Sequence, residues 1–348
     1  MSVLERTKQL IEKGRSNTVH YIPTGIEKLD EHTDGITQGT YIVVGAETTV
    51  GKTAFARDKY IHTAFEYYKK VNDPTKLDVL FVDLTLEIIP EINLAGAMTR
   101  KLFFDYGRVI PPKKILKSLS DENLQIVNSF DEYFKEFNSK CIVVDEDVTP
   151  GKYHDLLMEV AKRHGTFTKE ARFISECGEY VPNNPNLFVQ VILDTINLAE
   201  MDSGHNTIKS TIDRISRISV WFRNKCKFSF VVLQQFHGDL STTERRKHGS
   251  ITPKLTDLED SKRPSKDADI VLGLYDPIRH MTEDQSMFRG YDMTILKSWY
   301  RSLHILKNRR GENNKVIDLK FDGAVGYFTQ LPLTKDMDEM KYRLATQH

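Results

Sequence analysis

The residues with the clearest chemical meaning lie in the stretch GAETTVGKTAF at positions 45–55. A loop that binds nucleotide phosphates needs inward-pointing backbone N–H groups, a helix behind them, a lysine for the β- and γ-phosphates and a hydroxyl for Mg²⁺. Gly51, Lys52 and Thr53 supply the glycine, the lysine and the hydroxyl. The first position of the pattern, where glycine is usual, holds the small residue Ala46. The sequence therefore predicts a nucleoside triphosphate site, with Lys52 on the phosphates and Thr53 on Mg²⁺. Its predicted nucleotide contacts are Ala46, Glu47, Thr48, Thr49, Val50, Gly51, Lys52, Thr53 and Ala54.

The elements around this stretch are those that a phosphate loop requires. TYIVVGA, at 40–46, has the β-branched and apolar composition of a buried strand. After the loop, apolar residues recur at helical spacing at Ala54, Ile61, Phe65 and Tyr68. A coincidental glycine-rich turn is the plain alternative, and the order strand, loop, helix argues against it.

Further strands and helices alternate along the chain. The strand patterns VLFVD, CIVVD, VQVILD and FSFVVLQQ end in Asp83, Asp145, Asp194 and the pair Gln234 and Gln235. Helical patterns separate them at 119–139, 151–164 and 207–224. Because apolar strands that alternate with helices form buried parallel sheets, the sequence predicts an α/β fold with a mostly parallel central sheet flanked by helices.

The remaining segments set the expected organisation of the chain. The stretch 302–328, with RRGENN between two apolar runs, predicts a C-terminal β-hairpin followed by a further strand. Residues 1–17 carry a short amphipathic helix and are expected to act as a linker helix. The main domain is expected at 18–335, with an insertion near 165–188 that fits no regular period, and 336–348 form a polar tail.

Composition excludes several classes of protein. The 348 residues are 39% hydrophobic and 28% charged, with a formal net charge of zero, so a basic surface for nucleic acid would have to be local. No segment reaches the apolar length of a membrane span, and the N-terminus lacks the core of a signal peptide. The widely spaced Cys141, Cys177 and Cys226 argue against a disulfide framework or a zinc site, and a cytoplasmic location is expected.

Three strand-end acids compete for the metal. A nucleoside triphosphatase needs an Asp at a strand end beside the metal and a base that orients the attacking water. Asp83, Asp145 and Asp194 all have the required position after an apolar strand. The residue pattern by itself leaves the choice among them open.

An ordered set of motifs resembles the ATPase domain of DnaB-type replicative helicases, a family with the RecA fold. The resemblance begins in TGIEKLDEHTDGITQGTYIVVGAETTVGKTAFARDKYI, which contains the phosphate loop, and runs from about residue 23 to 333. VLFVDLTLEI resembles the strand that delivers the catalytic Glu, DVTPGKYHDLLMEVAKRHG the helix before the metal-side strand, and VILDTINL that strand itself. VVLQQFH resembles the strand of the sensor Gln, LTDLEDSKRPSKDADIVLGL the segment after the DNA-contacting loop, and LKNRRG the motif of basic fingers.

The resemblance implies a RecA-like P-loop ATPase that uses ATP and Mg²⁺. Glu87 would be the general base that polarises water, and Asp194 would hold Mg²⁺ through water. Gln235 would sense the γ-phosphate and relay its state to the DNA loop. Lys307 and Arg309 would reach the γ-phosphate of an adjacent subunit, as an arginine finger in trans.

The motifs also depart from the family pattern. The family usually has a Ser-Leu-Glu type sequence straight after the strand, whereas this chain has DLTLE, so Thr85 could occupy the Glu position. Asp83 and Glu91 remain rivals for the base, and Gln234 competes with the neighbouring Gln for the sensor role. Glu47 stands where the family often has Arg, and its plain interpretation is a side chain that points to solvent.

The basic pair of the hairpin has an ordinary alternative too. Lys307 and Arg309 alternate, so both lie on one face of their strand. A contact with a neighbouring phosphate needs that arrangement, and so does a solvated strand edge that resists aggregation.

The segment after the sensor strand is the expected DNA site. FHGDLSTTERRKHGSITPKLT is long and polar, and it holds Arg245, Arg246, Lys247 and His248 together. This cluster is predicted to contact the phosphates of a single strand without reading bases, the alternative being a solvated charge run. A second loop, 199–206, carries no Lys or Arg and would act through backbone N–H groups.

These features predict a ring-forming, ATP-driven motor on single-stranded DNA, expected as a homohexamer with primase or other replisome proteins as partners and no membrane contact. The runner-up is a RecA-like recombinase or regulatory ATPase that does not unwind, and a third alternative is a clamp or loader-type module. The family's N-terminal domain is not expected in this chain, which with the insertion resembles phage-encoded versions; the location would then be the host cytoplasm. The linker helix is expected to pack on its own domain or on a neighbouring subunit.

Overall fold

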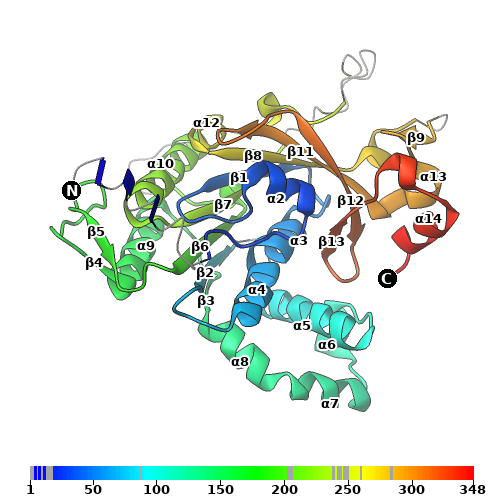
Figure 1. The fold of residues 1–348 in the computed structure, drawn as a ribbon, viewed down its shortest axis with the longest axis horizontal. Coiled ribbons are helices and arrows are strands. Elements are labelled where there is room, and N and C mark those ends of the chain that lie inside the picture. The colour runs from blue at the N-terminus through cyan, green and yellow to red at the C-terminus, as the bar shows by residue number, and fades with distance from the viewer. Residues whose placement is uncertain are drawn as a thin grey trace.

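The centre of the fold is a nine-stranded sheet of described strands, in the order β13-β12-β11-β8-β1-β7-β6-β2-β3 (Figure 1). The computed structural model describes residues 4, 5, 7, 8, 11, 12, 19–86, 88–201, 207–236, 240, 245, 251–258, 261–282 and 285–348. The strands from β3 to β8 in that order run parallel, and β11, β12 and β13 are antiparallel. The predicted α/β fold with a mostly parallel sheet and a C-terminal hairpin is confirmed.

The bounds of the strands agree with the apolar runs of the sequence. The strands of the main sheet are β1 (Tyr41–Ala46), β2 (Asp78–Thr85), β3 (Cys141–Val144), β6 (Leu187–Asp194), β7 (Ser229–Gln235), β8 (Ile270–Tyr275), β11 (Tyr300–Asn308), β12 (Lys315–Asp322) and β13 (Tyr327–Gln330). Every residue of β1 and β8 is buried, as expected for central strands covered on both faces.

Helices cover both faces of this sheet (Figure 1). The described helices are α2 (Glu27–Thr33), α3 (Lys52–Arg57), α4 (Thr63–Val71), α5 (Pro90–Tyr106), α6 (Pro112–Lys117), α7 (Asp121–Ser129), α8 (Asp131–Ser139), α9 (Pro150–His164), α10 (Ile208–Cys226), α12 (Arg263–Asp267), α13 (Met293–Leu296) and α14 (Glu339–Ala345). One core packs apolar residues of α2 to α8, such as Phe55 and Phe65, against the sheet. The other packs α9 and α10, through Leu157 and Phe222, against the opposite face.

The helix that follows the phosphate loop is interrupted by a short π-helical segment. Residues Asp58–His62 form a π-helical segment between α3 and α4, so helical spacing continues from 52 to 71 with one change of pitch. Asp58 is fully buried there and pairs with Lys59 at 3.0 Å and with Arg100 of α5. The segment therefore ties the helix of the phosphate loop to α5.

Two segments are more regular than the sequence indicates. Within the insertion, β4 (Gly165–Phe167) and β5 (Tyr180–Pro182) form a small antiparallel sheet, held to α9 by a hydrogen bond from the Tyr180 hydroxyl to the Ala161 carbonyl. The polar tail contains α14, whose Ala345 joins a third apolar cluster with Tyr291 and Tyr300. Both elements are short, and their apolar contacts come from distant parts of the chain.

The described residues 4, 5, 7, 8, 11 and 12 of the N-terminal segment are helical, and the role of this segment as a linker stays a prediction. Leu4 and Ile11, which share a face, are 65% and 58% exposed. In the described part of the chain, no helix combines the length and the apolar character that a membrane span needs.

Candidate nucleotide-binding site

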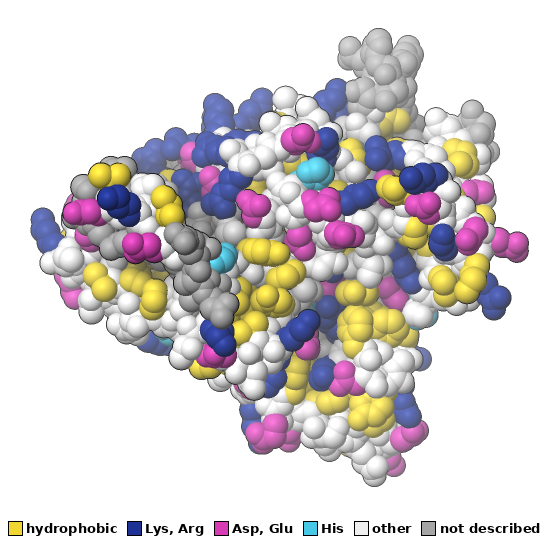
Figure 2. Space-filling model, viewed as in Figure 1, with side chains coloured by type: hydrophobic (Ala, Val, Ile, Leu, Met, Phe, Trp, Pro, Cys, Tyr) yellow, Lys and Arg dark blue, Asp and Glu magenta, His cyan; other side chains and the backbone are white. Residues whose placement is uncertain are grey.

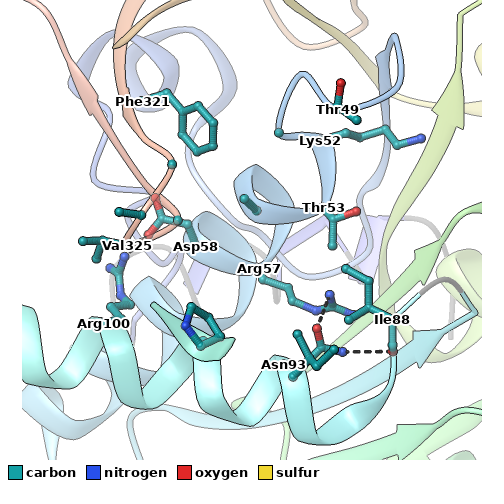
Figure 3. A pocket seen from close by; sticks show the side chains of 18 of the residues that line it. Thr49, Lys52, Thr53, Arg57, Asp58, Ile88, Asn93, Arg100, Phe321 and Val325 are labelled. Atoms are coloured by element: carbon teal, nitrogen blue, oxygen red, sulfur yellow. Dashed lines mark hydrogen bonds and ion pairs between the residues drawn. The ribbon is translucent and has the colours of Figure 1, made fainter. Parts of the chain in front are cut away.

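A cavity of about 380 Å³ opens at the carboxyl end of β1. Figure 3 shows Thr49, Lys52 and Thr53 on one side of it and Phe321, Val325 and Arg100 on the other. Its lining comes from the phosphate loop, the start of α5 and the turn between β12 and β13. The cavity therefore has a polar end beside the loop and an aromatic end beside the C-terminal hairpin.

The loop between β1 and α3 has a left-handed backbone at two positions. Thr49 has a φ of 59° and Gly51 a φ of 105°, both in the left-handed region. Glycine is favoured at that φ, which accounts for Gly51. Gly45 has a different reason, because a Cβ added there would lie 2.3 Å from the Phe236 ring. Gly45 thus permits a close approach of β1 to the chain that follows β7.

Lys52 and Thr53 open the helix behind the loop. Lys52 is the first residue of α3, is only 7% exposed and lines the cavity. The partial positive charge of a helix N-terminus and its N–H groups favour an anion at this point. Among the predicted nucleotide contacts, Glu47, Thr48, Thr49, Gly51, Lys52, Thr53 and Ala54 line the cavity, whereas Ala46 and Val50 are buried beneath it.

Asp194 is the strand-end acid that lies beside Thr53. The Thr53 hydroxyl donates to Asp194 Oδ1 at 3.1 Å. The other carboxylate oxygen, Oδ2, is buried and accepts no hydrogen bond from the described residues; Arg57 lies 3.8 Å from it. A hydroxyl and a buried carboxylate oxygen in this arrangement fit the oxygen preference of Mg²⁺. Asp145, by contrast, is exposed after the edge strand β3.

Asp83 is engaged in a buried ion pair with Arg57 of α3. Arg57 Nε lies 3.2 Å from Asp83 Oδ2, and its Nη1 donates to Asn93 Oδ1 at 2.7 Å (Figure 3 shows the latter contact). Burial raises the pKa of Asp83, and the Arg57 charge acts in the opposite direction. Both carboxylate oxygens of Asp83 face Arg57, so this acid serves the packing of α3 on β2.

The other candidates for the base are placed as follows. Glu87 lies outside the described residues, and its role stays a prediction; the next residue, Ile88, lines the cavity. Glu91 is exposed in the first turn of α5. The Thr85 hydroxyl is buried, donates to the Ile88 carbonyl and accepts from Asn93 at 3.0 Å.

The two glutamines at the end of β7 have different surroundings. Gln234 is fully buried and donates through Nε2 to the Ser261 carbonyl at 2.9 Å. Gln235 is half-buried and lines the cavity, and its backbone N–H donates to Asn197 Oδ1 at 3.3 Å. Gln235 thus lies at the cavity, at the end of the strand beside β1, and its role as a sensor of the γ-phosphate stays a prediction.

Lys307 and Arg309 lie near the amino ends of the parallel strands, whereas the phosphate loop lies at their carboxyl ends. Lys307 pairs in register with Val271 near the amino end of β8, while the loop follows the carboxyl end of β1, which runs parallel to β8. Lys307 Nζ donates to the carbonyls of Ser265, Lys266 and Ala268 at 2.7 to 2.9 Å.

Arg309 is the more exposed member of this pair. Its Nη2 donates to the Lys266 carbonyl at 2.7 Å, and its side chain is 48% exposed. Burial, and then the charge of Arg309, lower the pKa of Lys307. Both side chains reach the end of α12, although Arg309 lies one residue beyond the end of β11. Figure 2 shows Lys and Arg side chains gathered over the region of α10 and α12.

The predicted DNA contacts fall largely outside the described residues. Arg246, Lys247 and His248 are not described, nor are residues 202–206 of the second loop. Arg245 is described and pairs with Asp257 at 2.8 Å, with a further hydrogen bond to the Thr252 carbonyl at 2.9 Å.

Sequence reasoning missed the residues that hold the loop from behind. Arg279 donates to the Thr48 carbonyl at 2.6 Å, and Arg301 donates to the Val50 carbonyl at 2.8 Å. His280 lies 2.8 Å from Glu47, so the acid expected to point to solvent has a partner. No local sequence pattern indicates these distant residues. Arg57, in contrast, lies four residues after Thr53, so helical spacing places it on the same face of the helix.

Comparisons with known proteins place this geometry in a family context. No protein-family model matches the chain. Two replicative DNA helicases DnaB from Helicobacter pylori, of strains J99 and 26695, are each 23% identical to it, over 337 and 329 residues. The matches cover 95% and 93% of this chain and 54% and 52% of the relatives. The chain thus spans about half the length of the curated relatives it matches.

Solved structures give the same fold. One solved structure, described as an ATPase domain, has a TM-score of 0.68 and 18% identity, with 95% of this chain and 99% of that domain covered. A DnaB-like replicative helicase, described with its interactions with primase, has a TM-score of 0.66 and 18% identity, covering 95% and 68%. The resemblance to DnaB-type helicases and the RecA-like fold of this chain are confirmed.

Proposed function

We propose that this chain is an ATP-driven replicative DNA helicase that forms a ring, translocates on single-stranded DNA and unwinds duplex. The observation that carries the proposal is the Thr53 and Asp194 pair beside the phosphate loop, in a chain similar to DnaB-type helicases. The pair would hold Mg²⁺, and Lys52 would bind the β- and γ-phosphates of ATP. The bound metal would neutralise the charge that develops on the transferred phosphoryl group.

Hydrolysis would combine groups from two copies of the chain. Glu87 would orient the attacking water, and Gln235 would contact the γ-phosphate from the end of β7. Lys307 and Arg309 are too far from the loop of their own chain, since they lie at the other edge of the sheet. We therefore assign them to the γ-phosphate of a neighbouring subunit, where they would stabilise the transition-state charge.

Ring assembly would also use the N-terminal helix. Leu4 and Ile11 are exposed on one face, and a short amphipathic helix gains its stability by covering such a face. Docking on a neighbouring subunit would do so. Deletion of residues 1–17 is then expected to reduce the assembled mass measured by light scattering, and an unchanged mass would contradict this part of the proposal.

The proposed substrate of the motor is single-stranded DNA, held through Arg245, Arg246, Lys247 and His248. Contacts of this kind neutralise phosphates, so binding should weaken steeply with salt. Primase is a proposed partner because a solved relative is described with its interactions with primase.

A forked-duplex assay tests the proposal. The wild-type chain with ATP and Mg²⁺ should release the displaced strand, and Lys52→Ala should abolish release while keeping the thermal unfolding transition. ATP hydrolysis stimulated by single strands, without strand release, would instead support a RecA-like recombinase or regulatory ATPase. Electron microscopy with an ATP analogue and single-stranded DNA would show whether the assembly is a closed ring.

A further inference from the structure

Three residues from one region of the chain contact the phosphate loop, and a fourth joins two of them. We call Asp276, Arg279, His280 and Arg301 the outer brace. Arg279 ends the single 3-10 turn after β8 and His280 follows it directly, while Arg301 is the second residue of β11. Each of these three residues makes a polar contact with the loop, and Asp276 joins the two arginines.

The two arginines bind carbonyl oxygens of the loop. Arg279 Nη1 donates to the Thr48 carbonyl at 2.6 Å, and its Nη2 donates to the Thr49 hydroxyl. Arg301 Nε donates to the Val50 carbonyl at 2.8 Å. Arg301 is 4% exposed, so its contact is shielded from water, and Arg279 is about one-third exposed.

These contacts fix the direction of two N–H donors. In a planar trans peptide, the carbonyl of one residue and the N–H of the next point in opposite directions. Because the Thr48 and Val50 carbonyls point to the brace, the N–H groups of Thr49 and Gly51 point away from it. Thr49 and Gly51 line the cavity, so the brace orients donors toward the site of the phosphates.

Asp276 couples the two arginines and keeps them in place. Its Oδ2 lies 3.4 Å from Arg279 Nε and 3.3 Å from Arg301 Nη1. Its Oδ1 accepts from the backbone N–H of Ile278 at 3.2 Å, which fixes the start of the turn. Asp276 thus joins Arg279 and Arg301 through ion pairs.

His280 controls the one acid of the loop. Its Nε2 lies 2.8 Å from Glu47 Oε2, and its ring is 6% exposed and stacks on Tyr275 at a centroid distance of 5.5 Å. Glu47 lines the same cavity as Lys52. A carboxylate free to turn into that cavity would repel the phosphates, and the contact with His280 holds it aside.

We infer that the outer brace is a positioning device for nucleotide binding: its arginines preorient the loop donors, and His280 keeps Glu47 away from the phosphates. The inference rests on the proposed function, since it names what regulates affinity at that same nucleotide site. Preorganised donors bind an anion without the cost of reorientation, so the effect belongs to affinity rather than to the hydrolysis step.

A double-mutant cycle with MgADP tests the role of His280. Measured by titration calorimetry, His280→Ala should weaken MgADP binding about tenfold, because Glu47 is released. In the Glu47→Gln background the same substitution should change affinity by less than about twofold. His280→Gln retains a donor and should bind nearly as wild type. Independent, additive losses from Glu47→Gln and His280→Ala would overturn this role.

Arg279→Ala tests the orienting contacts, with Arg289→Ala as its matched control. Arg289 is similarly exposed and pairs with Asp318 at 2.8 Å, away from the loop. Arg279→Ala should weaken MgADP binding and raise the KM for ATP about tenfold, with kcat within about twofold, while Arg289→Ala leaves both unchanged. Equal behaviour of the two variants, with intact unfolding transitions, would overturn the inference.

The proposed function fails in a different way. If wild-type protein does not bind MgADP, or if Lys52→Ala binds it equally well, the nucleotide site itself is wrong. If wild type binds and Lys52→Ala does not, but the His280 cycle is additive and Arg279→Ala equals Arg289→Ala, the site stands and the brace does not.

Discussion

The central sheet has a carboxyl edge, where its parallel strands end, and an amino edge, where they begin. These two edges carry basic residues in very different surroundings. At the carboxyl edge, Lys52 and Arg57 border a cavity, and the acids Asp83 and Asp194 lie within the same network. At the amino edge, Lys307 at the end of β11 and Arg309 just beyond it bind main-chain carbonyls at the end of a short helix. The basic residues of the carboxyl edge line a cavity, whereas those of the amino edge bind main-chain carbonyls of the same chain.

This difference shows why one chain holds only part of the proposed site. The carboxyl edge has the loop, a helix N-terminus and the Thr53–Asp194 pair, so under the proposed function it would bind a nucleotide without a second copy. The amino edge has the basic residues Lys307 and Arg309 but, among the described residues, no phosphate-binding loop. Under the proposed function, a neighbouring subunit would bring the phosphate to them. Within the pair, Lys307 has three carbonyl acceptors and Arg309 is half exposed, so Arg309 is the residue better placed to reach outward.

Arg309→Ala is expected to give the largest effect and tests whether the amino edge acts in trans. As a uniform assembly, the variant should lose about 10³-fold in ATP hydrolysis, the scale of an arginine finger. Mixed with wild type, it should lower activity below the value for simple dilution, because one variant subunit disables a neighbouring site. Nucleotide binding should be retained, since the carboxyl edge is intact.

Arg310→Ala is the matched control for that experiment. Arg310 is adjacent and donates to the Thr37 hydroxyl at 2.6 Å and to the Gly39 carbonyl at 3.4 Å, so it holds the chain locally. Mixtures with this variant should follow simple dilution. A loss proportional to the fraction of Arg309→Ala protein would count against action between subunits.

Glu87→Gln should give the next largest effect, at the carboxyl edge. A positioned general base contributes about 10²- to 10⁴-fold, so hydrolysis should fall by at least about 10²-fold while MgATP affinity stays near that of wild type. Steady-state ATPase rates and calorimetric titration with ATP measure the two quantities. Unchanged hydrolysis would return the role to Glu91 or to another acid.

The sequence predicted the parts of the fold that repeat a local pattern. The alternation of strands and helices and the C-terminal hairpin follow from short-range signals, and the structure confirms them. The phosphate-loop motif also follows from a short-range signal and is flanked by the predicted strand and helix, while its binding of phosphate stays a prediction. The sequence does not predict β8 as a separate strand, although β8 lies beside β1 in the centre of the sheet. Its run IVLGLY is short, and what makes it a central strand is pairing with residues far away in sequence.

The candidate site divides in the same way. Lys52 and Thr53 are recognisable because their spacing is fixed by one turn of chain. The choice among strand-end acids depends on the order of the strands in the sheet. This order puts Asp194 beside Thr53, whereas Asp145 follows the outermost strand, β3. The contact of Glu47 with His280 joins residues 233 positions apart, and no local pattern could reveal it.

Asp83→Asn should affect stability more than chemistry, which separates this acid from the proposed base. The substitution leaves Arg57 buried with a weaker partner, and breaking a buried ion pair costs about 3 kcal/mol or more of the free energy of unfolding. Urea unfolding measures the loss, and at a temperature where the variant is folded its ATPase rate should remain within about tenfold of wild type. Normal stability with abolished hydrolysis would mean that Asp83 is the base.

The smallest expected effect concerns the acid sensitivity of the carboxyl edge, through His62. This residue lines the nucleotide cavity and stacks on Phe137, and burial, with the nearby Arg100 and Arg57, lowers its pKa to about 3. In the unfolded chain its pKa is about 6.5. Below that value the unfolded state takes up a proton that the folded state does not, so the free energy of unfolding falls as the pH drops from about 6.5 toward 3.

His62→Phe keeps the ring contact and removes this titration. Between pH 7 and pH 5, wild type should lose about 2 kcal/mol more of its free energy of unfolding than the variant, measured by urea unfolding at both values. His304, whose pKa burial lowers to about 4, is present in both proteins and cancels in the difference. The exposed His20 supplies the control, since His20→Phe should retain the wild-type pH dependence. An identical pH dependence for all three proteins would contradict the prediction. It would show that His62 becomes protonated in the folded state as readily as in the unfolded one.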